Sequence, residues 1–249
     1  MKRWLLAGAM AFATAGQGLA SDLPPPAAPP SPRAPAAYVP PVAAIYNWGG
    51  VYFGFNLGFG FGTSSWNDPR NFSGLTSTGN FNLTGFLTGP TIGVNFQTDS
   101  FVFGAEADFD GSFIDGKKSS SFCGSVGFGS GVQCETKSRW FSTVRARLGY
   151  AADRVLFYGT AGGAFGDISS GINGSFQSST KAGWTAGAGI EAAFTDNLTA
   201  RIEYLFMSLQ NGSCNNASNC GLDAPGVPAN DTVKFSTSMI RLGLDYKFR

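Results

Sequence analysis

Histidine is absent from this 249-residue sequence, and its absence excludes several kinds of enzyme chemistry. Ser-His-Asp and Cys-His catalysis need an imidazole, and so do zinc sites with histidine ligands. The pair Asp108 and Asp110 leaves paired-carboxylate glycoside hydrolysis open, but these residues stand two apart beside several arginines, which neutralise them. We therefore expect no enzymatic activity, no cofactor and no bound metal.

Charged residues are scarce, at 13% of the chain against about 25% in an ordinary soluble domain. Without Lys2 and Arg3, which lie in a predicted leader, 15 of the 17 basic residues remain against 16 acidic ones. This balance argues against nucleic acid as a partner. Glycine is abundant instead, with 35 residues, as expected where half of each strand faces lipid and a tight interior favours small side chains.

Long apolar runs are also missing, apart from one at residues 4–15 that follows Lys2 and Arg3. Small residues at Gly18 and Ala20 complete the pattern of a secretory signal peptide over residues 1–20, cleaved after Ala20. The alternative is an uncleaved transmembrane helix, but the run is shorter than the roughly 20 residues that a bilayer requires.

A segment rich in proline and alanine follows, and we assign residues 21–45 to a linker. Nine prolines between positions 24 and 41 prevent sheet pairing and favour extended polyproline II. Two interpretations stay open for this linker: a periplasmic arm that contacts peptidoglycan, or a disordered spacer that remains after export.

The remaining chain, residues 46–249, alternates apolar with small or polar residues at period two. Eight such stretches lie at 51–59, 86–96, 101–109, 140–150, 155–165, 184–194, 198–206 and 240–248. Large side chains bracket seven of them about ten residues apart, the length of a tilted membrane-spanning strand. The pattern predicts an all-β fold, an eight-stranded antiparallel transmembrane β-barrel with its apolar side chains toward lipid. The alternative is a soluble lipocalin-like barrel with the apolar face inside.

Connection lengths predict the orientation of this barrel. Short turns are expected at 98–100, 151–153 and 195–197, and we place them in the periplasm. Long polar loops are expected at 62–83, 111–138, 166–181 and 208–232, on the extracellular side.

Two of these long segments contain the four cysteines. From the three possible connectivities we choose two local disulfides, Cys123 with Cys134 and Cys214 with Cys220, as suits an exported protein. Each would stabilise its loop by roughly 2–3 kcal/mol in the chain-entropy model. A zinc site is the competing interpretation, but the spacings are wrong and no histidine completes it.

The inward positions of the predicted strands carry charges of both signs. A structural ion-pair network that fills the narrow interior is the simpler interpretation, and a gate over a narrow water path is the alternative. These inward residues are Glu106, Asp108, Asp110, Arg139, Arg145, Arg147, Arg154, Glu191, Arg201, Glu203, Arg241, Asp245 and Lys247.

Both ends of the mature chain resemble a known family. The opening Tyr-Asn-Trp-Gly-Gly-Val-Tyr-Phe-Gly at 46–54, the closing strand at 240–248 and the Asp-Leu-Pro at 22–24 are similar to the small opacity-type outer-membrane barrels of rhizobia, brucellae and bartonellae. The resemblance implies an abundant, porin-like surface antigen, integral to the outer membrane of a Gram-negative bacterium, whose partners are membrane lipid and lipopolysaccharide. It also implies an assembly signal in the closing strand, read by the outer-membrane assembly machinery at Leu244, Tyr246 and Phe248.

This sequence departs from the family pattern at two points. Arg249 follows the aromatic residue that usually ends such barrels, and the mature chain would begin Ser21-Asp22 where relatives tied to the cell wall begin Ala-Asp. Haemin binding, known in some relatives, would have to use ligands other than imidazole. We expect a structural and surface-interaction barrel that contributes to envelope integrity and is closed by its ion pairs; the alternative is a narrow passive channel.

Overall fold

The computed structural model of this protein describes residues 46–67, 77–119, 133–172, 175–214 and 231–248. The predicted signal peptide at 1–20, the predicted linker at 21–45, and the cysteines Cys123 and Cys220 lie outside these ranges. No helix in the described part of the chain is long and apolar enough to span a membrane.

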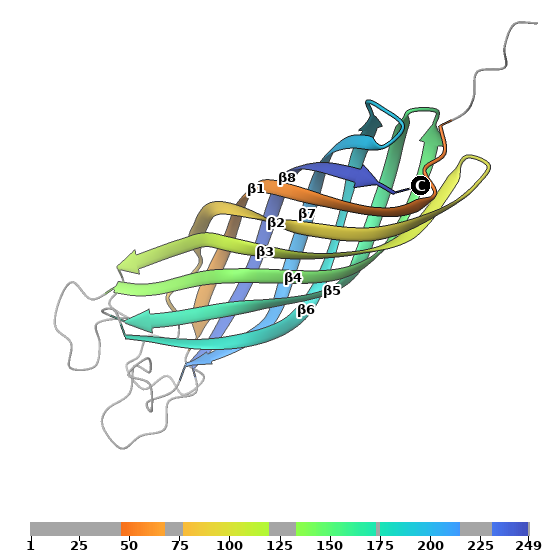
Figure 1. Cartoon of the computed structure of the whole chain (residues 1–249). Coiled ribbons are helices and arrows are strands. Elements are labelled where there is room, and N and C mark those ends of the chain that lie inside the picture. The colour runs from red at the N-terminus through yellow and green to blue at the C-terminus, as the bar shows by residue number, and fades with distance from the viewer. Residues whose placement is uncertain (1–45, 68–76, 120–132, 173–174, 215–230, 249) are drawn as a thin grey trace, which may run out of the picture. The chain divides into compact units, whose positions relative to one another are not determined.

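Eight long strands make up the described fold (Figure 1). Each strand pairs antiparallel with its neighbours in the sequence, and the first pairs with the last, so the sheet closes into a barrel. The predicted eight-stranded antiparallel barrel is therefore confirmed. The strands are β1 (Gly50–Asn67), β2 (Phe81–Thr98), β3 (Phe101–Ser119), β4 (Gln133–Ala152), β5 (Val155–Ile172), β6 (Ser175–Ala193), β7 (Leu198–Cys214) and β8 (Asp231–Lys247).

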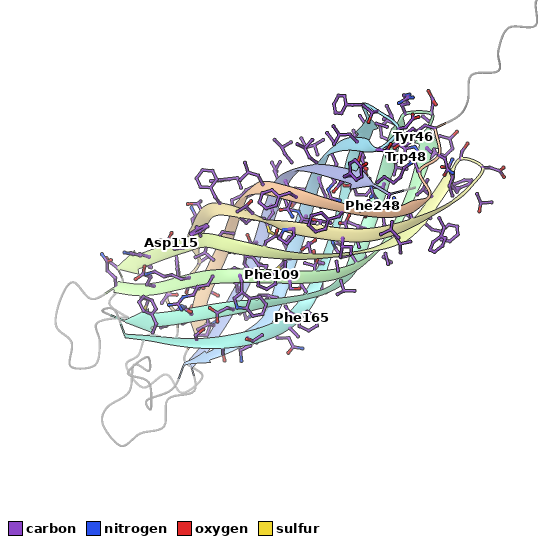
Figure 2. All side chains as sticks on the ribbon, in the orientation of Figure 1. Tyr46, Trp48, Phe109, Asp115, Phe165 and Phe248 are labelled. Atoms are coloured by element: carbon purple, nitrogen blue, oxygen red, sulfur yellow. The ribbon has the colours of Figure 1, made fainter. Side chains whose placement is uncertain are left out.

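Bulky apolar side chains cover the outer wall in the half of the barrel nearest the tight turns. Phe53, Phe86 and Leu148 are 51%, 62% and 65% exposed, whereas the inward Arg145 on β4 is 1% exposed. Phe109 and Phe165, labelled in Figure 2, belong to this outward set. The apolar residues of the alternating pattern thus face outward, as the sequence predicts. The alternative prediction, a lipocalin-like barrel with its apolar face inside, is wrong.

Three short turns join the strands at one end of the barrel. The turns after β2 and β4 each contain an aspartate in the left-handed region, Asp99 with φ 53° and Asp153 with φ 52°, a conformation that Asp tolerates better than most residues. The third turn spans residues 194–197. All three lie where the sequence predicts short connections.

The strands continue far beyond the predicted loop boundaries, so the expected long loops at 62–83, 111–138, 166–181 and 208–232 are wrong in extent. β5 and β6, for example, run to Ile172 and from Ser175. A strand of 18 residues is roughly 60 Å long, or roughly 45 Å along the axis of a barrel with 40° tilt, against an apolar band of roughly 25 Å. The sheet therefore extends well past the membrane on the side opposite the tight turns.

The interior is filled in three successive layers. Near the tight turns lies an apolar cluster, which includes Val102 and Leu156, the second residues of β3 and β5. Charged residues occupy the middle. A larger apolar layer fills the far half, with Leu83 and Ile114 among its members. Since an eight-stranded barrel is only wide enough for side chains, these layers occupy its cross-section.

Candidate functional site

The middle layer gathers charged side chains from five strands, and we call it the charged layer. Strict alternation along each strand turns them inward, and each is at most 5% exposed. Its members are Glu106, Asp108 and Asp110 on β3, Arg145 and Arg147 on β4, Glu191 on β6, Arg201 and Glu203 on β7, and Arg241, Asp245 and Lys247 on β8.

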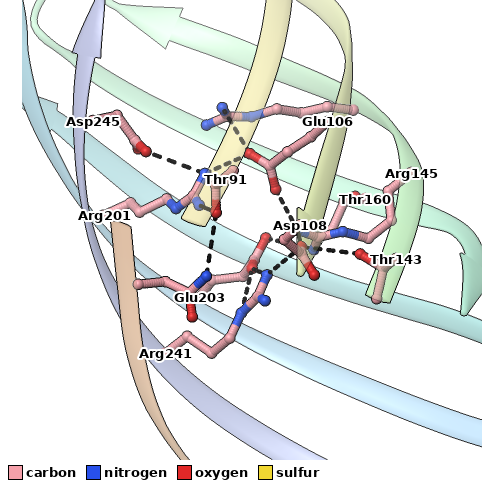
Figure 3. A network of polar contacts seen from close by, with 12 residues as sticks. Thr91, Glu106, Asp108, Thr143, Arg145, Thr160, Arg201, Glu203, Arg241 and Asp245 are labelled. Atoms are coloured by element: carbon pink, nitrogen blue, oxygen red, sulfur yellow. Dashed lines mark hydrogen bonds and ion pairs between the residues drawn. The ribbon is translucent and has the colours of Figure 1, made fainter. Parts of the chain in front are cut away.

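Arg145 lies at the centre of this layer (Figure 3). One guanidinium nitrogen, Nη2, lies 2.7 Å from Asp108 Oδ2 and also contacts the Glu106 carboxylate, while Nη1 donates to Glu203 Oε1 at 3.0 Å. Thr143 donates a further hydrogen bond of 2.9 Å to Asp108. A single cation thus joins carboxylates from two strands on opposite parts of the wall.

Two further arginines extend the network from β7 and β8. Arg241 bonds Asp110 at 3.0 Å and Asp108 at 3.3 Å, and it also contacts Glu203. Arg201 contacts Glu106, lies 3.5 Å from Asp245, and donates to the Thr91 hydroxyl at 3.1 Å. Asp108 and Asp110, the pair considered for acid–base catalysis, are therefore both engaged by one guanidinium group.

Nearer the tight turns, Arg147 connects the charged layer to two tyrosines. Its guanidinium contacts Glu191 and lies 3.7 Å from the centroid of the Tyr158 ring, close enough for a cation–π interaction. Tyr52 donates its hydroxyl proton to Glu106 at 2.7 Å. Sequence reasoning missed both tyrosines, although Tyr52 shares its parity with the inward Asn56 on β1 and Tyr158 shares its parity with the inward Thr160 on β5.

Two of the predicted inward residues are not part of this network. Arg139 is exposed, because the β3–β4 register shifts between Gly111 and Ile114 and the β4–β5 register shifts between Lys137 and Phe141. Such bulges break the strict alternation and move a side chain to the other face. Arg154 lies in the turn after β4, about half exposed, and pairs with Asp196 at 3.2 Å. The prediction that Arg139 and Arg154 face the interior is therefore wrong.

The far apolar layer separates the charged layer from the extracellular end, and sequence reasoning did not foresee it. Leu87, Leu205 and Met207 are 0–1% exposed. The ring of Phe141 lies 5.9 Å from that of Phe235, centroid to centroid. Water that crossed the barrel would have to pass this layer as well as the ion pairs.

The residues before β1 cover the tight-turn end of the barrel (Figure 2). Trp48 is 1% exposed; its indole donates to the Asp153 carbonyl at 2.9 Å and its amide to Gln97 at 2.6 Å. Tyr46 donates its amide to the Asp153 side chain at 3.2 Å, and the Lys247 ammonium lies 4.1 Å from its ring centroid. These contacts tie the entering chain to the turn after β4 and to the ends of β2 and β8.

The cysteine predictions fall largely on residues that the structure does not describe. Cys134 is fully buried and disulfide-bonded, and the side chains of the other three cysteines are not described. Cys214 ends β7, and its side chain is not described. The pairings Cys123–Cys134 and Cys214–Cys220 therefore stay predictions.

The closing strand presents the expected aromatic and apolar face. Leu244, Tyr246 and Phe248 are 58%, 52% and 54% exposed on the outer wall, and the rings of Tyr246 and Phe248 meet edge to face at 5.3 Å. The residues proposed as an assembly signal thus share one surface.

The matching family model and the sequence relatives agree with this architecture. The family model described as "Outer membrane protein beta-barrel domain" matches residues 34–248. The chain is 37% identical over 220 residues to the 31 kDa outer-membrane immunogenic protein of Brucella melitensis, covering 82% of this chain and 85% of that protein. It is 33% identical over 170 residues to a 22 kDa outer membrane protein of Rhizobium leguminosarum, covering 68% of each. Among solved structures, Neisserial surface protein A aligns with 78% of this chain and 97% of its own, at 14% identity and a TM-score of 0.41.

Proposed function

This chain belongs to the outer membrane protein beta-barrel domain family, and on that basis we propose that it is a closed structural barrel that contributes to envelope integrity without conducting solutes. It is an integral outer-membrane protein of the type represented by the Brucella and Rhizobium relatives. The observation that supports closure most directly is the stacking of a charged layer between two apolar layers inside one narrow barrel.

The geometry of the ion pairs favours a structural role for the charged layer over a gate. Removing one partner of a buried ion pair leaves an uncompensated charge, at a cost of about 3–5 kcal/mol. Here each arginine contacts more than one carboxylate, so exchange of a single pair leaves the others in place. A gate that worked by such exchange would open only the middle layer, because Leu87, Leu205 and Met207 still fill the path beyond it.

The function as an envelope component is testable in cells. A strain that lacks the gene should become more sensitive to detergent and to chelation of divalent cations, and expression of the full chain should restore resistance. Unchanged resistance of the deletion strain would contradict the proposed contribution to integrity.

Solute passage is tested separately with liposomes. Vesicles that contain the refolded full chain should not swell in isosmotic arabinose or glycine faster than vesicles without protein. A rate that rises with the amount of protein would favour the passive-channel alternative instead.

Two partner proposals follow from the ends of the chain. We propose that the assembly machinery reads the shared outer face of Leu244, Tyr246 and Phe248, and Phe248→Ala should then lower the folded fraction in outer membranes. We also propose that residues 21–45 contact peptidoglycan; co-sedimentation with purified cell-wall sacculi should then decrease when this segment is replaced by a Gly-Ser linker of equal length.

A further inference from the structure

Residues 46–49, which we call the strap, lie at the tight-turn end of the barrel just before β1 (Figure 2). The order of strands around the barrel places the turn between β4 and β5 opposite the seam where β1 pairs with β8. The strap reaches that turn, because the Trp48 indole donates to the Asp153 carbonyl and the Tyr46 amide donates to the Asp153 carboxylate. The Tyr46 hydroxyl also donates to the carbonyl of Asp196, in the turn after β6, at 3.2 Å. The strap therefore joins the start of β1 to turns across the mouth of the barrel.

The strap also holds the end of β8. The Lys247 ammonium donates to the Asn47 carbonyl, so a side chain of the last strand is tied to the strap itself. The Phe248 amide donates to the Val51 carbonyl at 2.9 Å and continues the seam to the end of the described chain. The Asn197 side chain donates to the Lys247 carbonyl at 2.8 Å, which ties β8 to the same turn that the strap contacts. Both strands of the seam are thus held from outside their own ladder of hydrogen bonds.

The position of the strap is closely defined at both of its ends. The chain turns from the strap into β1 at Gly50, whose φ of 127° is rarely adopted by residues with a side chain. An added Cβ there would lie 3.0 Å from the Phe248 carbonyl oxygen. Trp48 is 1% exposed and belongs to the apolar cluster that contains Val102 and Leu156. The strap can move away from the mouth only if this indole leaves the cluster.

We propose that the strap is a latch on the β1–β8 seam. These two strands are neighbours in the barrel but lie at opposite ends of the chain, so no connecting segment joins them, unlike every other pair of adjacent strands. At the tight-turn end, where Tyr52 pairs with Lys247, the seam separates only after Trp48 leaves the mouth and the bonds to Asp153 break. The latch closes last, because its partners come together only when all eight strands have paired. This inference is independent of the proposed contribution to envelope integrity.

The test is hydrogen–deuterium exchange of the refolded full chain in detergent micelles, resolved by mass spectrometry of peptides. Exchange of protected amides reports local opening under native conditions. Asp153→Gly removes the carboxylate that accepts from Tyr46 and keeps a residue suited to the left-handed turn. Although this change lies opposite the seam, it should raise exchange in peptides that cover 50–55 and 244–248 by roughly fivefold, the factor expected for the loss of one hydrogen bond. Trp48→Ala should raise exchange there by roughly tenfold or more, because it removes the buried ring as well.

Asp99→Gly is the matched control. Asp99 has the same backbone conformation in the turn after β2, and its side chain forms no hydrogen bond to the strap within the described residues. This variant should leave exchange at the seam at the wild-type level. In Asp153→Gly, a peptide that covers 101–105, on the β3–β4 pair, should stay as protected as in the wild type over the same labelling period. Wild-type exchange at the seam in Asp153→Gly or in Trp48→Ala, an equal rise at the seam in Asp99→Gly, or an equal rise at 101–105 in Asp153→Gly would each overturn the latch.

Discussion

Replacing Arg145 with methionine is the most informative test of the charged layer. Met keeps the length and most of the volume of the side chain but removes the cation that contacts three buried carboxylates. Each of those carboxylates keeps at least one other guanidinium partner: Arg201 and Arg147 for Glu106, and Arg241 for Asp108 and Glu203. The loss should therefore fall near the lower end of the range for breaking a buried ion pair, about 3 kcal/mol.

The assay is urea unfolding of refolded protein in detergent micelles, followed by the ratio of folded to unfolded bands on unboiled gels. Arg154→Met provides a matched control, because this arginine is about half exposed and its ion pair, with Asp196, lies at the tight turns. A surface pair of this kind contributes about 0–1 kcal/mol. If Arg145→Met lowers the free energy of unfolding by no more than Arg154→Met does, the charged layer does not stabilise the barrel as argued here.

Three further predictions concern other parts of the chain. Trp48→Ala should lower the free energy of unfolding by about 3 kcal/mol, because it removes a fully buried indole and its hydrogen bond to Asp153; a urea midpoint within error of wild type would contradict this. Gly85→Ala should impair refolding because its Cβ would meet the backbone of β3, whereas Gly163→Ala, on open outer wall, should refold normally; equal refolding yields would argue against the β2–β3 packing. Non-reducing proteolysis with mass spectrometry should recover a peptide that joins Cys123 to Cys134, and a peptide that joins Cys134 to another cysteine would refute the predicted pairing.

The eight strands, their closure and the tight turns followed from period-two alternation, because lipid contact requires apolar residues at every second position of the membrane-facing wall. The charged layer followed from the same parity, as Glu106 and Arg145 show: they face each other in the β3–β4 register.

The far halves of the strands were missed for one physical reason. Beyond the membrane the wall meets water, so the apolar phase reverses: Leu83 and Phe235 face inward there, whereas Phe86 and Ile240 on the same strands face outward. In these far halves the apolar residues point inward and the outward residues are polar. A search for strands with apolar residues on the outer face takes such a segment for a loop, so the far halves of the strands and the far apolar layer were missed.

Arg139 was misplaced for a related reason. Parity assigns a face only while the register is unbroken, and nothing in the sequence around Arg139 marks the bulges on either side of β4.

Single-channel recording in planar bilayers tests the closed interior most directly. The refolded full chain and its Arg145→Ala variant should both leave a flat baseline, because Leu87, Leu205 and Met207 fill the barrel beyond the ion pairs. Discrete, ion-selective openings of the wild type would contradict a closed barrel, and openings that appear only in Arg145→Ala would show that the ion pairs alone block a water path.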